Sequence, residues 1–209
     1  MIALNNISKR IKNKDILVQV AYEFEPGKIY GLYGRNGSGK TMLLRAIAGL
    51  ISLDDGEITI DDKTLHKDMD FPESVGVIIE HTNLLPQYDA FTNLKLLSKI
   101  KKVATEEDIR NAILAVGLDP DCKDRVWTYS LGMKQRLAIA QAIFENPDIL
   151  LLDEPTNALD EKSIDMVRGI LLQKKAEGKT IILASHNKED LDILSDVTIK
   201  MDAGQLVVA

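Results

Sequence analysis

The sequence contains little that would place this chain outside the reducing interior of a cell. Cys122 is the only cysteine in 209 residues, so the chain can form no internal disulfide and offers no second thiol for a metal site. No apolar run approaches the eighteen or so residues that a membrane span requires, and residues 1–12 lack the pattern of a signal peptide. We therefore expect a cytoplasmic chain.

A basic surface is also missing. The net charge is −6, and lysines are scattered among acidic residues without forming a run. Proteins that bind DNA or RNA use clustered cations to neutralise phosphates, and this composition does not supply them. We expect no nucleic-acid partner.

The residues that are present predict one α/β domain over residues 1–209. Hydrophobic residues make up 45% and charged residues 28%, a balance typical of a globular core. Alternating apolar residues over 18–24 predict an N-terminal antiparallel part. Later strands alternate with helices, which predicts a mainly parallel sheet covered on both faces. Strand patterns disappear between about 82 and 146, where we expect an inserted helical subdomain.

A glycine-rich segment, Gly34–Thr41, follows an apolar strand at 29–33 and opens a helix. It fits the pattern G-x-x-x-x-G-K-[ST], the phosphate loop of nucleotide-binding proteins, in the context that this motif requires. Its glycines let backbone N–H groups surround phosphates, Lys40 reaches the outer phosphates and the Thr41 hydroxyl can bind Mg²⁺. ATP with Mg²⁺ is the expected ligand. The residues expected to bind the nucleotide here are Gly34, Asn36, Gly37, Ser38, Gly39, Lys40 and Thr41.

Two acidic residues follow the apolar strand at 149–152. Parallel strands present their carboxyl ends at one edge of a sheet, where ligands bind, and Asp153 and Glu154 lie at that point. Asp153 is suited to the magnesium shell, and Glu154 is suited to orienting and deprotonating the attacking water. The alternative is an acidic helix start leading into Pro155 and Thr156, which leaves the preceding apolar strand unexplained.

A third motif distinguishes among phosphate-loop proteins. The segment Tyr129–Arg136 reads Tyr-Ser-Leu-Gly-Met-Lys-Gln-Arg and resembles the signature sequence of ATP-binding cassette (ABC) ATPases, commonly Leu-Ser-Gly-Gly-Gln. Ser130 and Gly132 are kept, whereas Leu131 and Met133 replace a glycine and the glutamine. Such variants are similar to those of single-cassette exporter ATPases. A serine hydroxyl and a glycine N–H at a helix start can also bind an anion, although Ser130 could equally be a simple helix cap.

The resemblance implies a nucleotide-binding subunit that hydrolyses ATP to energise transport, with export as the expected direction. Such subunits pair head to tail, so that Ser130 and Gly132 of one copy face the phosphate loop of the other, and they act through separate integral membrane permease subunits at the inner face of the membrane. A homodimer is the expected pair.

The resemblance also implies roles for four further residues. Asp160 matches the D-loop that passes information across the dimer, and His186 matches the switch histidine that contacts the terminal phosphate. Glu80 occupies the place of a magnesium-contacting glutamine, as in bacterial ATPases for peptide antibiotics, and adds negative charge near Asp153. Ile11 occupies the place of the aromatic residue that stacks on adenine.

Three other interpretations compete with this one. The segment 187–190, Asn-Lys-Glu-Asp, matches the N-K-x-D pattern by which GTPases read guanine, but no D-x-x-G follows Asp153 and a GTPase leaves the signature motif unexplained. A soluble, non-transport ABC ATPase would need long insertions, a second cassette or a basic surface. A low-turnover ATP sensor is motivated by Glu80 alone.

Overall fold

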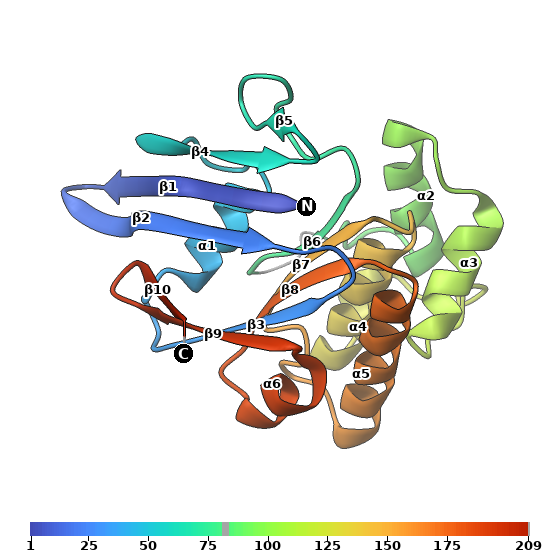
Figure 1. Ribbon diagram of the computed structural model, residues 1–209. Helices are drawn as coiled ribbons and strands as arrows, with labels where there is room; N and C mark the ends of the chain where they lie inside the picture. Colours follow the sequence, from blue (N-terminus) through green and yellow to red (C-terminus); the bar gives the residue numbers. More distant parts are fainter. Residues whose placement is uncertain (81–83, 209) are drawn as a thin grey trace.

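The computed structural model describes residues 1–80 and 84–208, and Figure 1 shows two sheets with a group of helices beside the larger one. Residues 81–83, within which the expected helical subdomain begins, lie outside the described residues. The larger sheet has the strand order β10-β9-β3-β8-β7-β6. Its strands are β3 (Ile29–Tyr33), β6 (Val75–Ile78), β7 (Ile149–Asp153), β8 (Thr180–Ala184), β9 (Val197–Asp202) and β10 (Gln205–Val208).

The larger sheet is parallel from β9 through β6, and only the edge strand β10 pairs in antiparallel fashion. Its central strands are apolar throughout because both faces are covered. In β7, Leu150 and Leu152 pack with the outer helices, whereas Ile149 and Leu151 pack on the opposite face, as the two-residue period of a strand requires. The prediction of a mainly parallel, covered sheet is confirmed.

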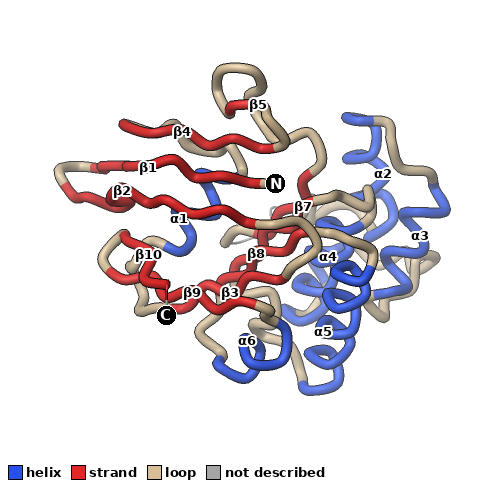
Figure 2. The backbone as a smooth tube through the Cα atoms, viewed as in Figure 1, coloured by secondary structure: helices blue, strands red, loops and turns tan. Residues whose placement is uncertain are grey.

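The N-terminal part forms a separate antiparallel sheet with the order β2-β1-β4-β5 (Figure 2). It consists of β1 (Ile2–Ile11), β2 (Lys14–Phe24), β4 (Asp55–Ile60) and β5 (Lys63–Thr64). Helix α1 (Lys40–Ile47) packs its buried residues, including Leu43 and Leu44, into one core with residues from both sheets. The helix ends before Gly49, whose φ of 74° a helix cannot contain. The sheets therefore hold α1 between them.

The remaining helices lie beyond the other face of the larger sheet, three of them against its strands and two packed outside these. They are α2 (Ala90–Lys101), α3 (Glu106–Ala115), α4 (Leu131–Ile143), α5 (Glu161–Ala176) and α6 (Lys188–Leu194), with the short 3₁₀ helix η1 (Val126–Thr128) before α4. Helices α2, α3 and α4 lie within the stretch of about 82–146 where a helical subdomain is expected, whereas α6 was not predicted. Helix α4 lies so close to β6 that a Cβ placed on Gly76 would approach the Ala142 carbonyl oxygen to 2.0 Å. That glycine fixes the end of α4 against the sheet.

Candidate functional site

The phosphate loop takes its shape from glycine at positions where another residue would be strained or would collide. A Cβ on Gly34 would lie 2.1 Å from the Met201 carbonyl oxygen, and Gly37 has a φ of 77°. Gly39 is the N-cap of α1, so the free N–H groups of the first turn of that helix face the loop. The predicted order of strand, loop and helix is therefore present in the structure.

Two polar side chains of the loop are buried within it. Lys40 is 8% exposed, and its Nζ donates to the carbonyl oxygens of Gly34 at 2.7 Å and of Arg35 at 3.3 Å. The Ser38 hydroxyl is buried without a hydrogen-bond partner in residues 1–80 and 84–208. A buried hydroxyl needs such a partner, and a buried ammonium favours an anion beside it. Both groups fit a phosphate.

Asp153 lies beside the phosphate loop as the sequence predicts. The Thr41 hydroxyl donates to Asp153 Oδ2 at 2.6 Å, which joins the end of β7 to the start of α1. Burial raises the pKa of Asp153, and the negative charges of Glu154 and Glu80 act in the same direction. A hydroxyl and a carboxylate held together next to a phosphate site match the oxygen ligands of Mg²⁺. A cation there would also offset the cost of burying this carboxylate.

Glu154 and His186 meet at the next position along the same edge. His186 Nδ1 lies 2.8 Å from Glu154 Oε2, and the His186 backbone N–H donates to Oε1 at 3.0 Å. Glu154 has a φ of 50°, in the left-handed region that non-glycine residues seldom adopt, and its N–H donates to the Ala184 carbonyl oxygen at 2.8 Å. The alternative of a helix start is wrong, because α5 begins only at Glu161.

Glu80 is engaged in an ion pair that the sequence did not reveal. Its Oε2 lies 2.7 Å from Arg45 Nη2, on the last turn of α1, with the Glu80 side chain 57% exposed and the Arg45 side chain 33% exposed. Arg45 therefore places a positive charge beside the carboxylate that we expected to add negative charge near Asp153. The sequence alone does not predict this ion pair, because no motif or spacing connects residues 45 and 80.

Ser130 and Asp160 both cap helices. Ser130 Oγ accepts the Met133 N–H at 3.2 Å at the start of α4, and Asp160 Oδ1 accepts the Ser163 N–H at 2.9 Å at the start of α5. Hydrogen bonding by Ser163, through its side chain first and its backbone N–H second, holds the pKa of Asp160 below its ordinary value. A Cβ on Gly132 would lie 3.2 Å from the Ala158 carbonyl oxygen, so the two capped segments lie side by side. Within one copy of the chain, Ser130 therefore acts as a helix cap. A contact between Ser130 and phosphate would require a second molecule.

A cleft of about 330 Å³ lies over the phosphate loop. Its lining includes loop residues, Asp153 and Glu154, but neither Ser130 nor Ile11. Ile11 is 40% exposed at the end of β1, whereas Lys14 and Ile16 of β2 line the cleft. Sequence reasoning missed these two residues. The two-residue period of β2 places them on one strand face and is the signal that could have found them.

Comparison with known proteins agrees with this geometry. The family model for ABC transporters matches residues 17–157. The chain belongs to the ABC transporter family. It is 59% identical over 206 residues to the uncharacterized ABC transporter ATP-binding protein YybJ of Bacillus subtilis (strain 168), covering 99% of this chain and 94% of YybJ. It is 34% identical over 209 residues to the lantibiotic transport ATP-binding protein SrtF of Streptococcus pyogenes, covering 100% of this chain and 90% of SrtF.

The fold is that of a solved ABC ATPase cassette. The dimeric structure of MJ0796, a bacterial ABC transporter cassette, superposes with a TM-score of 0.89 at 25% identity, covering 99% of this chain and 96% of that one. The predicted fold class and the predicted activity, ATP hydrolysis that energises transport, are confirmed by the family assignment. No helix in the described part of the chain is both long and apolar enough to span a bilayer.

Proposed function

We propose that ATP binds with its phosphates in the loop Gly34–Thr41 and that Glu154 and His186 carry out its hydrolysis. The observation that carries this proposal is the adjacency of two pairs, Thr41 with Asp153 and Glu154 with His186, at the carboxyl edge of one sheet. Glu154 is the general base for the attacking water, and His186 fixes the direction of its carboxylate. Lys40 stabilises charge on the outer phosphates.

Mg²⁺ is the proposed cofactor, held by the Thr41 hydroxyl and the Asp153 carboxylate together with phosphate oxygens. When bound, Mg²⁺ neutralises developing negative charge on the phosphates. Glu80 is the third proposed oxygen ligand, and its Oε2 is paired with Arg45 in this structure. The chemistry of this set, one hydroxyl and two carboxylates, suits a hard cation that keeps some of its waters.

A second copy of this chain is the proposed partner in catalysis. Ser130 and Gly132 of the second copy would approach the phosphates, and Asp160 would transmit the state of one site to the other. Two observations support this arrangement: the homologous cassette MJ0796 was solved as a dimer, and Leu131 between the two signature residues is 68% exposed. The exposed segment is free to pack on a partner surface.

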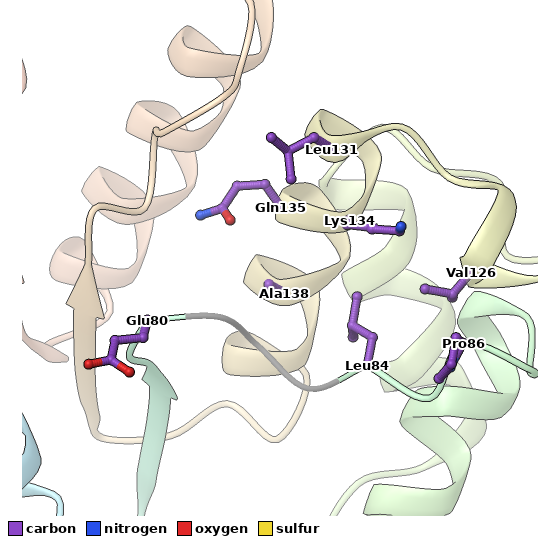
Figure 3. A pocket seen from close by; sticks show the side chains of 8 residues that line it. All are labelled: Glu80, Leu84, Pro86, Val126, Leu131, Lys134, Gln135 and Ala138. Carbon is purple, nitrogen blue, oxygen red and sulfur yellow. The ribbon is translucent and has the colours of Figure 1, made fainter.

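Membrane permease subunits are the proposed partners in transport. A groove of about 250 Å³ lies beside α4. In Figure 3, Leu84 extends toward α4, Pro86 lies beside Val126, and Glu80 lies at the other end. An exposed apolar side chain, Trp127 at 63% exposure, follows Val126 of this lining. Such a patch marks a protein interaction site. We place the chain at the inner face of the cell membrane, with the helical segment of residues 84–146 contacting the permease.

The proposed cargo is a peptide antibiotic, which the permease would expel. The name of the relative SrtF, a lantibiotic transport protein, and the glutamate at position 80 support this choice. Peptide stimulation of ATPase activity in the assembled transporter would test it, with a scrambled peptide of equal charge as the control.

Phosphate release and copurification test the function itself. The purified chain should release phosphate from ATP in the presence of Mg²⁺, and Lys40→Ala should abolish this activity. A membrane protein encoded beside this gene should copurify with the wild type and be lost from Trp127→Ser. Negligible hydrolysis by both the wild type and Glu80→Gln would instead establish the low-turnover sensor. Hydrolysis by a wild-type chain with which no membrane protein copurifies would favour a soluble ABC ATPase.

A further inference from the structure

Asp190 is a buried carboxylate for which the proposed mechanism has no use. It is 1% exposed, although it lies in α6 only four residues after His186. Its Oδ2 accepts the Thr156 hydroxyl at 2.5 Å, and its Oδ1 accepts Arg168 Nε at 2.9 Å and lies 2.7 Å from Arg168 Nη2. Arg168 also reaches Glu189 at 3.2 Å. A buried charge is tolerated when it is paired in this way.

This burial removes the guanine-reading interpretation of residues 187–190. A carboxylate that reads a base must face the nucleotide, whereas both oxygens of Asp190 are directed into contacts with Thr156 and Arg168. The side chain of Asn187 is likewise engaged, because its Oδ1 accepts the Glu189 N–H at 3.0 Å. The Asn187 and Asp190 side chains of the N-K-x-D match therefore make internal contacts and do not face a base.

Thr156 belongs to the turn that carries Glu154. The left-handed backbone of Glu154 is strained and persists only where surrounding contacts enforce it. Within the turn, the Asn157 N–H donates to the Glu154 carbonyl oxygen at 3.1 Å. From α4, Gln135 Nε2 donates to the Pro155 carbonyl oxygen at 2.9 Å. From α6, Asp190 holds the Thr156 hydroxyl, so side chains of two helices hold the turn from outside it.

We propose that Asp190, with Arg168, and Gln135 are positioning residues that hold the strained turn at Glu154 so that its carboxylate meets His186. Asp190 acts on both members of the pair. It accepts a hydrogen bond from the turn that follows Glu154, and it lies in the helix that follows His186. One buried hydrogen bond between Thr156 and Asp190 thus ties together the two segments that supply the Glu154–His186 pair. The proposal rests on the proposed role of Glu154 in hydrolysis.

The direct test removes this hydrogen bond at nearly constant volume. Thr156→Val should lower kcat by about ten- to a hundredfold, because misplacing a catalytic group costs that much, and should change the KM for ATP by less than about twofold. Thr59→Val, in strand β4 and away from the site, is the matched control and should leave both constants unchanged. Gln135→Leu should resemble Thr156→Val. An unchanged kcat in Thr156→Val overturns the proposal.

A double-mutant cycle separates positioning from general damage to the fold. In a Glu154→Gln background, Thr156→Val should lower the residual rate by less than about twofold, because the group that it positions is already absent. A full additional loss in that background contradicts the proposal.

A measurement that does not depend on ATP hydrolysis can test the positioning role separately from the proposed function. The chain has three histidines, so the ring resonances of His186 can be assigned by NMR with a His186→Gln comparison. Thr156→Val should shift these resonances by loosening the Glu154 contact, even in a chain without ATPase activity. Unchanged resonances overturn the positioning role. A wild type that releases no phosphate, with shifted resonances in Thr156→Val, refutes only the proposed function.

Discussion

Replacing Glu154 by glutamine should separate the chemistry of the site from its architecture. Glutamine keeps the shape of the side chain and one carbonyl oxygen, which can still accept the His186 N–H that now lies 3.0 Å from Glu154 Oε1. The contact that changes is the one between Oε2 and Nδ1 at 2.8 Å, where an amide replaces a charged oxygen. The Glu154 side chain is 26% exposed and that of His186 65% exposed, so solvent already weakens this contact.

These contacts set the expected magnitudes. The loss of this partly solvated contact should lower the free energy of unfolding by about 1 kcal/mol or less, which corresponds to a fall in Tm of roughly 2–4 °C. Removal of a general base should lower kcat by about 10²- to 10⁴-fold, or about 3–5 kcal/mol in the activation free energy. The change in activation free energy should therefore be several times larger than the change in the free energy of unfolding.

The assay combines phosphate release, thermal unfolding and size-exclusion chromatography. With ATP and Mg²⁺, Glu154→Gln should elute at twice the chain mass of 23.2 kDa, because ATP that is not hydrolysed keeps the two copies together. Glu107→Gln, an exposed acid in the first turn of α3, is the control and should behave as the wild type. If Glu154→Gln elutes as a monomer with ATP and Mg²⁺, the sandwich dimer is wrong for this chain; if it retains full turnover, Glu154 is not the base.

Four further substitutions test neighbouring parts of the site. Asp153→Asn should abolish Mg²⁺-dependent turnover yet raise the Tm of the nucleotide-free chain by roughly 1–3 °C. Because the folded pKa of Asp153 is raised, wild-type stability falls as pH rises through the window between the unfolded and folded values, so this gain should be present at neutral pH and vanish in acid when measured by calorimetry. Gly34→Ala, which would collide with the Met201 carbonyl oxygen, should cost about 1–3 kcal/mol of stability and eliminate binding of a fluorescent ATP analogue. Glu80→Gln should lower the pKa of Asp153 and move the acid limb of the ATPase pH profile to lower pH, whereas Arg45→Gln should move it to higher pH; identical profiles would show that the ion pair does not affect the metal site.

The sequence predicts this fold well where local chemistry and tertiary contacts agree. The run at 149–152 predicts a doubly covered strand because no polar residue interrupts it, and the glycines of 34–39 predict the loop because their backbone conformations are available to few other residues. These features placed Asp153 and Glu154 at the correct edge of the sheet.

Pairings between distant segments were not predictable from spacing. Arg45 and Glu80 meet only because α1 and the end of β6 come together in the folded chain. Helix α6 was missed because its acidic first turn resembles a polar loop, and the burial of Asp190 depends on Arg168, more than twenty residues away. The cleft residue Ile16 was overlooked in favour of Ile11, because motif position alone cannot show which strand residue borders a cavity.

The close approach of Gly76 to Ala142 makes α4 a lever with a fixed end. About 18 Å of helix separate that anchor from Ser130, at 1.5 Å per residue, so a rotation of about 10° about the anchor would carry the signature serine by roughly 3 Å. The same rotation would move Gln135 by about half as much, which is enough to detach it from the Pro155 carbonyl oxygen. A small push on the groove beside α4 would thus reach the turn that holds Glu154.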